Sequence, residues 1–214
     1  MTPADSSAYL LDIRQRMASA SPTPQKAPHL QRSDWIDAGM ARLATDGFES
    51  VRVELLARDL RVSKGSFYWH FHDREQLLAV MLSRWETDER DRLRSVASQA
   101  AASRWAWFVE QNSSSDRVRI EAGVRGWARK DVRVAASVAI CDEEKRRFIS
   151  DVLQDIGFER SASESWSKVV LLVWLGWLAG AANSGSEGQN SSLGDLLSKL
   201  LLAASTSSSQ SARA

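Results

Sequence analysis

Two short helical segments that follow one another closely restrict the fold of this chain more than any other feature. Within residues 62–71, Phe67 and Phe71 lie four positions apart, so a helix here has one apolar face. Ser63 can cap the start of that helix, because its hydroxyl oxygen accepts hydrogen bonds from backbone N–H groups of the first turn. A helix this short is unstable alone, so neighbouring helices must hold it in place.

The segment immediately before it, residues 53–60, has the apolar periodicity of a second short helix. Only Arg61 and Val62 connect the two segments. Two short helices joined in this way predict a helix-turn-helix, in which the second helix enters the major groove of DNA. The alternative is an ordinary helical hairpin inside an all-α domain.

This region resembles the DNA-binding domain of the TetR family, which are bacterial, dimeric, all-helical transcription regulators. The resemblance covers roughly residues 30–80 and lies in Leu56-Ala57, Val62 to Tyr68, His70-Phe71, Asp73-Arg74-Glu75 and Leu77-Leu78. It implies a repressor that binds a palindromic operator as a homodimer and is released by a small-molecule effector. Together with the local charges it predicts DNA contacts at Arg52, Arg61, Ser63, Lys64, Gly65, Ser66, Tyr68, Trp69, His70 and Arg74.

The sequence departs from the family pattern at two positions. Arg61 stands in the turn where the family usually has Gly, so we expect Arg61 to adopt a left-handed backbone conformation at some energetic cost. Arg52 stands where the family usually has a Thr or Ser that caps the following helix. We expect Ser50 to replace that cap.

Helical periodicity continues through the remaining chain, with Asp73 and Asp131 as candidate caps of two longer helices. The predicted fold class is all-α, with a three-helix helix-turn-helix domain followed by a helical ligand-binding and dimerisation domain. The predicted boundaries are a flexible arm over 1–28, the DNA-binding domain over 29–76, the regulatory domain over 77–204 and a disordered tail over 205–214.

Overall charge gives no indication of a nucleic-acid partner, because the net charge is +1 and the isoelectric point about 7.9. A DNA footprint must therefore come from the local placement of basic side chains. The single cysteine, Cys141, excludes an internal disulfide framework and is expected to be an inert core thiol. No signal-peptide pattern is visible, and the longest apolar run, Val169 to Ala182, is too short to span a bilayer. These features predict a cytoplasmic protein without a membrane partner.

Catalytic and metal-binding patterns are not apparent in the sequence. His70 and His72 lie beside Asp73, but no cysteine or helical i,i+4 partner completes a metal site. No Ser-His-Asp set, carboxylate pair or Gly-rich phosphate loop emerges. We therefore expect no metal, no cofactor and no enzymatic activity.

More than half of the nine tryptophans lie within residues 95–185. They suggest either core packing or an aromatic pocket for an apolar or cationic effector. Effector binding within residues 95–185 would move the helix that follows the helix-turn-helix. The candidate pocket residues are Trp105, Phe108, Trp127, Val138, Trp174 and Trp177.

The last two predicted helices, about 164–182 and 192–203, carry more apolar surface than one protomer readily covers. We therefore expect them to form the dimer interface as a four-helix bundle. The alternative from another functional class is a helical assembly protein without sequence-specific DNA binding. The candidate interface residues are Trp166, Val170, Val173, Gly176, Trp177, Gly180, Leu193, Leu197 and Leu200.

Overall fold

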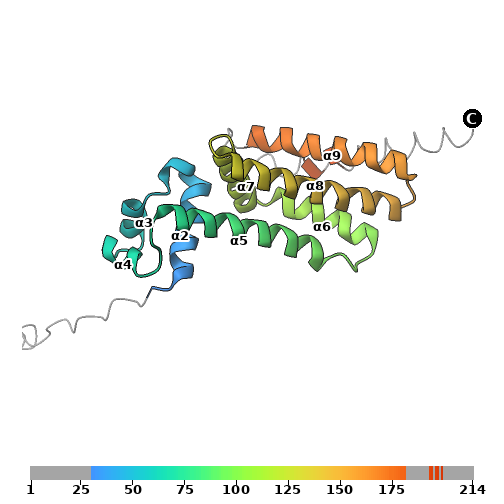
Figure 1. Cartoon of the computed structure of the whole chain (residues 1–214). Helices are drawn as coiled ribbons and strands as arrows, with labels where there is room; N and C mark the ends of the chain where they lie inside the picture. The colour runs from blue at the N-terminus through green and yellow to red at the C-terminus, as the bar shows by residue number, and fades with distance from the viewer. Residues whose placement is uncertain (1–29, 182–192, 195, 198, 200–214) are drawn as a thin grey trace, which may run out of the picture. The chain divides into compact units, whose positions relative to one another are not determined.

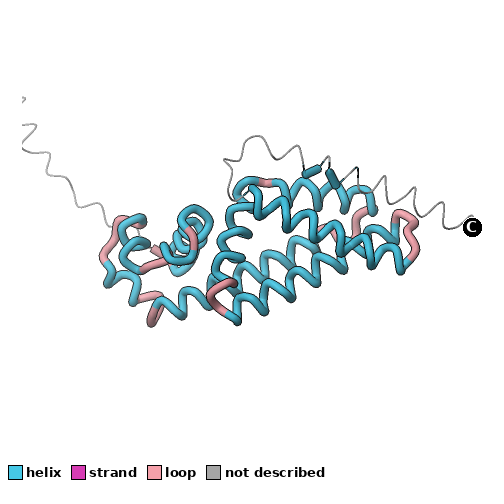
Figure 2. The backbone as a smooth tube through the Cα atoms, turned by 90° about the horizontal axis from the view of Figure 1, so that it is seen from above, coloured by secondary structure: helices cyan, strands magenta, loops and turns pink. Residues whose placement is uncertain are grey.

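The computed structural model describes residues 30–181, 193–194, 196–197 and 199. The described residues are helical apart from short connections, and none of them lies in a strand (Figure 2). This confirms the predicted all-α fold class. The elements are α2 (Arg32–Asp46), the 3-10 helix η1 (Phe48–Ser50), α3 (Val53–Asp59), α4 (Lys64–Tyr68), α5 (Arg74–Ser95), α6 (Ala101–Ser113), α7 (Ser115–Ala128), α8 (Val132–Asp155) and α9 (Arg160–Ala181).

The helices α2, α3 and α4 share a small aromatic core. Phe67 of α4 is fully buried, and its ring packs edge-on against Trp35 of α2 at a centroid distance of 5.2 Å. Phe71 stacks on Phe67 at 5.3 Å, as their four-residue spacing predicts. This core gives the short helix α4 the support that it lacks alone.

Helix α5 extends from beside α2 to the helices of the C-terminal part, where it packs against α8 (Figure 1). Asp73 caps its N-terminus, because the Asp73 Oδ1 atom accepts a hydrogen bond of 2.8 Å from the Gln76 N–H. Asp131 caps α8 in the same way, through a 2.9 Å hydrogen bond from the Arg133 N–H. Both predicted caps are confirmed.

The helices α6, α8 and α9 enclose an apolar cluster, to which the helical residues Leu193 and Leu197 also belong. Two of its aromatic residues, Phe108 and Trp174, are almost fully buried. The apolar faces of these helices are therefore packed against one another within the chain, as their amphipathic periodicity predicts.

Helix α2 also packs directly against α7. A Cβ atom on Gly123 of α7 would clash with the backbone of Leu43, so the two helices approach closely at this glycine. Nearby, the rings of Phe48 and Trp127 stack at a centroid distance of 5.2 Å and an angle of 10°. These contacts join the helix-turn-helix helices to the C-terminal helices.

A cluster of buried charges lies where α5, α7 and α8 meet. The Lys145 ammonium is 3.1 Å from Glu89 Oε2 and 3.2 Å from Glu121 Oε1, and all three side chains are 2% exposed. Burial acts to raise the pKa of Glu89, but Lys145 and Arg117 overcome this and hold that pKa below its usual range. The same ammonium lies 4.6 Å from the centroid of the Trp174 ring.

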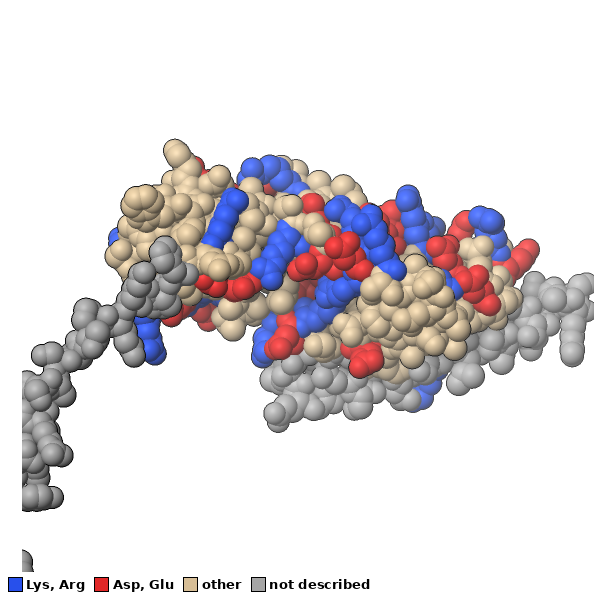
Figure 3. Space-filling view, turned by 90° about the horizontal axis from the view of Figure 1, so that it is seen from below, with Lys and Arg blue, Asp and Glu red and all other residues tan. Residues whose placement is uncertain are grey.

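On the surface, basic and acidic side chains are interspersed, as the face in Figure 3 shows. None of the described helices is both long and apolar enough to cross a membrane. The predicted N-terminal arm, residues 182–192, Leu200 and the predicted tail lie outside the described residues.

Two predicted helix caps differ from the structure. The Ser50 hydroxyl does not cap α3, because it donates hydrogen bonds to the carbonyl oxygens of Gly47 and Arg42 at 2.7 and 3.1 Å. Arg52 occupies the capping position of α3 without a side-chain cap bond. Ser63 does hold the capping position of α4, but its side chain makes no capping hydrogen bond.

Candidate nucleic-acid interface

Helix α4 divides its side chains between the core and the solvent. Phe67 points into the aromatic core, which places Lys64, Gly65 and Tyr68 on the exposed side. Tyr68 is 62% exposed and the adjacent Trp69 is 88% exposed, which is unusual for large aromatic residues. This helix therefore presents an uncovered polar and aromatic surface.

Lys64 is not an isolated cation on this surface. Its ammonium lies 3.1 Å from Glu54 Oε1 on α3, and both side chains are 60% exposed. Hydrogen bonds from the Glu54 backbone N–H and from Lys64 hold the pKa of Glu54 below its usual range. An approaching phosphate must therefore compete with Glu54 for the ammonium group.

The turn between α3 and α4 has the geometry expected from the sequence. Arg61 has a φ of 57°, and it is the one non-glycine residue with positive φ in the described part of the chain. This confirms the expected left-handed conformation, which the backbone takes up despite the steric cost of a side chain. The Arg61 side chain projects into solvent, as does that of Arg52.

Arg74 has a different environment from the other predicted DNA-contact residues. Its Nε atom donates a 2.6 Å hydrogen bond to the carbonyl oxygen of Val51, and its guanidinium lies 4.8 Å from the centroid of the Phe48 ring. Arg74 thus connects the start of α5 to the segment that precedes α3. No local pattern indicates this internal role, since Val51 lies 23 positions away.

The remaining predicted contact residues lie along the same surface. Ser63 is exposed, whereas Ser66 and His70 are half-buried. The neighbouring His72 is exposed, and its Nδ1 atom lies 3.1 Å from Asp73 Oδ2. Among the described residues, no three His, Cys, Asp or Glu side chains are grouped as metal ligands would be.

Four of the candidate effector residues, Trp105, Phe108, Trp174 and Trp177, belong to or pack against one apolar cluster. Phe108, Val138 and Trp174 are buried in the protein interior, while Trp105 and Trp177 are half-buried. Trp127 is also buried and belongs to the contact with Phe48, and in addition it lines a cavity beside α5.

Sequence reasoning missed the buried Lys145 cluster, because Lys145 lies within a run of charged residues that resembles a solvated helix surface.

Cys141 is buried, as predicted for a core thiol. Burial is the main cause that raises the pKa of Cys141 to about 12. The thiol is therefore protonated at neutral pH and chemically unreactive.

The candidate dimer residues divide into two groups. Val170, Leu193 and Leu197 are buried within the protomer, and so they do not form its outer surface. Gly176 and Gly180 are exposed, and a Cβ atom at either position would meet nothing within 4 Å. Leu172, on the same side of α9, is 66% exposed. Trp166, Val173 and Trp177 are half-buried beside this surface.

Residues 36–81 match the family model described as bacterial regulatory proteins, tetR family. The chain carries a TetR-family DNA-binding domain. The matched residues include α3, the turn at Arg61 and α4, so the match coincides with the exposed surface described above. The TetR-type domain identifies the chain as a transcriptional regulator.

Solved structures of TetR-type and other regulators resemble the protein over most of its length. A transcriptional regulator from Rhodococcus sp. Rha1 is 20% identical, with a TM-score of 0.66 over 80% of this chain and 94% of that one. A putative transcriptional regulator from Saccharomonospora viridis, solved in complex with choline, is 15% identical, with a TM-score of 0.68 over 79% and 94%. A TetR transcription regulator from Haloarcula marismortui is 14% identical, with a TM-score of 0.66 over 80% and 96%. At these identities the likeness shows a shared fold. No curated protein sequence matches the chain.

Proposed function

We propose that this TetR-type protein is a repressor that binds a palindromic DNA operator as a homodimer and is released by a small-molecule effector. The observation that carries the proposal is the exposed surface of α4, where Lys64, Tyr68 and Trp69 project from a helix whose other side is locked in the core. A helix held in this way can enter the major groove without unfolding. Lys64, Ser66 and Gly65 are the residues nearest the start of α4, the part of a recognition helix that contacts base edges.

Selection of bound genomic fragments, followed by mobility-shift titration, tests this proposal. We expect Lys64→Ala and Tyr68→Phe to weaken binding while helicity stays unchanged. If Lys64 contacts a phosphate, its loss lowers the slope of log affinity against log salt by about one. If it contacts guanine, discrimination at one base pair falls by about 1–3 kcal/mol instead.

Lys168→Ala is the matched control, because Lys168 is an exposed lysine on α9, away from the helix-turn-helix. Affinity unchanged in both α4 variants, or lowered equally by Lys168→Ala, would rule out α4 as the reading helix. Failure to retain any fragment would favour the alternative of a helical assembly protein.

The outward side of α9 supports the proposed homodimer. Val169, Leu172, Gly176 and Gly180 follow one another at helical intervals and are all exposed. Two copies of such a helix can cross closely where glycines lie four positions apart, and burial of the apolar surface contributes about 25 cal/mol per Å². We expect Gly180→Arg to split the dimer, measured by sedimentation at micromolar concentration.

A control places the same side chain on another exposed site. Thr87→Arg on α5 should leave the dimer intact, since Thr87 is exposed and α5 packs against α2 and α8. If Gly180→Arg stays folded and dimeric, the interface lies elsewhere.

Effector control is the third part of the proposal. Helix α5 follows α4 directly and packs against α8, so a ligand that shifts α5 would alter the separation of two reading helices in a dimer. The regulator from Saccharomonospora viridis binds choline, which makes an organic cation a reasonable class to test first. A ligand that changes operator affinity in a mobility-shift titration, while leaving the dimer intact, would support this part.

A further inference from the structure

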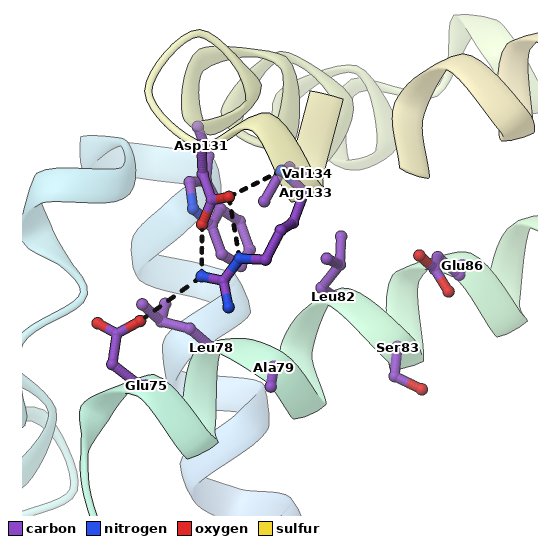
Figure 4. Close-up of a pocket in the computed structure, with 10 residues that line it drawn as sticks. Glu75, Leu78, Ala79, Leu82, Ser83, Glu86, Asp131, Arg133 and Val134 are labelled. Atoms are coloured by element: carbon purple, nitrogen blue, oxygen red, sulfur yellow. Dashed lines mark hydrogen bonds and ion pairs between the residues drawn. The ribbon is translucent and has the colours of Figure 1, made fainter. Parts of the chain in front are cut away.

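A cavity of about 260 Å³ lies between α5 and the corner where α7 meets α8 (Figure 4). Its floor is apolar, since Leu78, Trp127 and Val134 are all buried. The side formed by α5 exposes Ala79 and Ser83 to the cavity. The other lining residues are Leu82 and the charged residues Glu75, Glu86, Asp131 and Arg133.

The charged lining of the cavity is predominantly acidic, because three carboxylates face a single guanidinium. Figure 4 shows the Arg133 guanidinium between Asp131 and Glu75, 2.8 Å from Asp131 Oδ2 and 3.9 Å from Glu75 Oε2. The closer partner, Asp131, neutralises this guanidinium. Glu86 lies 3.9 Å from Arg90, whose guanidinium is closer to Glu144 at 3.2 Å. The lining residues therefore carry a formal excess of two negative charges over an apolar floor.

Trp127 gives the cavity an aromatic wall. Its side chain is 3% exposed, and its Nε1–H group is buried without a hydrogen-bond partner among the described residues. The ring of Trp127 also stacks on Phe48, so one indole belongs both to the cavity and to the contact with the DNA-binding domain.

We propose that this cavity binds a small organic cation that has an ammonium group and an apolar body. The apolar body would lie on Leu78, Val134 and the indole of Trp127. The ammonium group would face the carboxylate of Glu86, which is about three turns of α5 away from the Glu75 that pairs with Arg133. The volume is near the lower end of ligand pockets, so the ligand is a small one.

Ligand binding here would reach the DNA-binding domain through two packed residues, and this step rests on the proposed function. Trp127 stacks on Phe48, and Phe48 in turn lies beneath the Arg74 guanidinium that holds the carbonyl oxygen of Val51. Val51 immediately precedes the capping position of α3. A displacement of the Trp127 ring is thereby transmitted to the start of the helix-turn-helix.

Direct binding is measured on the full chain without DNA, by isothermal titration calorimetry with 2-phenylethylammonium and with butyltrimethylammonium. The controls are neutral 2-phenylethanol and anionic 3-phenylpropionate, which resemble the first cation in shape. We expect at least one cation to bind at one site per chain, about tenfold or more tightly than either control. If neither cation binds, or if the alcohol binds equally well, the proposal is overturned.

The location is tested by 19F spectra of protein labelled with 5-fluorotryptophan, in which Trp127→Phe identifies one of the nine tryptophan signals. The cation should shift the Trp127 signal more than the others. Ala79→Phe fills the cavity from an exposed position on α5 and should reduce affinity about tenfold or more. Glu86→Gln should weaken binding about three- to fivefold, as expected for a partly exposed charge.

Asp151→Asn is the control, because it removes an exposed carboxylate near the other end of α8 and should leave affinity unchanged. Binding that survives Ala79→Phe, or that falls equally in Asp151→Asn, places the ligand elsewhere and overturns the site. Circular dichroism verifies that each variant is folded.

Coupling to DNA is scored separately, so the two proposals can fail independently. If the cation binds wild type but not Ala79→Phe, the site stands even when no DNA fragment is retained. If DNA binds but the cation leaves its affinity unchanged, the site stands and its connection through Phe48 is rejected. We expect the cation to change operator affinity about fivefold or more in wild type, as is usual for coupled sites, and to leave it unchanged in Ala79→Phe.

Discussion

Gly123 on α7 lies against the backbone of Leu43 on α2, so closely that a Cβ atom at position 123 would come within 3.0 Å of the Leu43 carbonyl carbon. One turn earlier on α2, a Cβ atom on Gly39 would lie 2.7 Å from the Met81 sulfur on α5. One helix of the DNA-binding domain thus approaches two other helices closely at glycine residues. The backbone at Leu43 cannot move aside as the flexible Met81 side chain can. An added side chain is therefore tolerated less well at Gly123 than at Gly39.

Gly123→Ala should therefore force α2 and α7 apart. We expect a loss of about 1–3 kcal/mol in the free energy of unfolding, as for other overpacked contacts. Urea denaturation followed by circular dichroism measures the change. Gly126→Ala on the same helix is the control, because its Cβ atom would meet only the Arg129 guanidinium, at 3.7 Å. That variant should be neutral or gain up to about 1 kcal/mol from helix propensity. Equal stability of the two variants would contradict the tight contact.

Arg61→Gly should stabilise the fold, because Arg61 holds a φ of 57°. The expected gain in unfolding free energy is about 0.5–1 kcal/mol. Glycine removes the steric penalty of the left-handed conformation, but part of this gain is offset because glycine has more conformational entropy in the unfolded chain. DNA affinity should fall if the exposed guanidinium contacts a phosphate. Arg58→Gly, within α3 and also exposed, should instead destabilise by about 1 kcal/mol. A lower melting temperature for Arg61→Gly than for wild type would show that the turn is not strained.

Lys145→Met should be strongly destabilising. The change leaves the buried carboxylates of Glu89 and Glu121 without the ammonium that lies about equally close to both. Removal of one partner from a buried ion pair typically costs about 3–5 kcal/mol of unfolding free energy, measured by denaturant titration. Each carboxylate keeps an arginine partner, Arg117 at Glu89 and Arg125 at Glu121, so the cost should lie toward the lower end of that range. Lys168→Met on the surface should stay within about 0.5 kcal/mol of wild type, and a similarly small effect at Lys145 would refute the argument.

Stability should depend on pH through Glu89, whose pKa is held low by Lys145 and Arg117 against the opposing effect of burial. An unfolded glutamate has a pKa of about 4.3, so below that pH the unfolded chain binds a proton that the folded protein does not. Acidification through this range therefore favours unfolding, down to the folded pKa. We expect wild type to exceed Glu89→Gln in stability by a constant amount from pH 7 to about 5, and the difference to shrink at lower pH.

Glu110→Gln, an exposed substitution on α6, is the comparison for this titration. Its difference from wild type should stay small across the same pH range. A wild-type advantage over Glu89→Gln that persists unchanged to pH 3 would mean that folding does not lower the pKa of Glu89, and it would refute this prediction.

Local chemistry in the sequence was sufficient for the helix-turn-helix and for the caps at Asp73 and Asp131, but not for the caps predicted at Ser50 and Ser63. Asp73 and Asp131 cap the helices that follow them, because a short acceptor side chain reaches N–H groups only two or three residues away. The positive φ of Arg61 was predictable from the family resemblance instead, because the family usually has Gly in this turn. The exposed polar side of α4 follows from the spacing of Phe67 and Phe71.

The tertiary structure alone decided which distant side chains meet. Periodicity shows which side of a helix is apolar, but it does not identify the helix that covers that side. The hydrogen bond from Arg74 to Val51 could therefore not be predicted from local sequence. Nor could the burial of Lys145 between Glu89 and Glu121, because the sequence neighbours of Lys145 are charged. The cavity wall at Trp127 has the same origin: it exists because α5, α7 and α8 converge there, and that convergence depends on long-range packing rather than on any local signal.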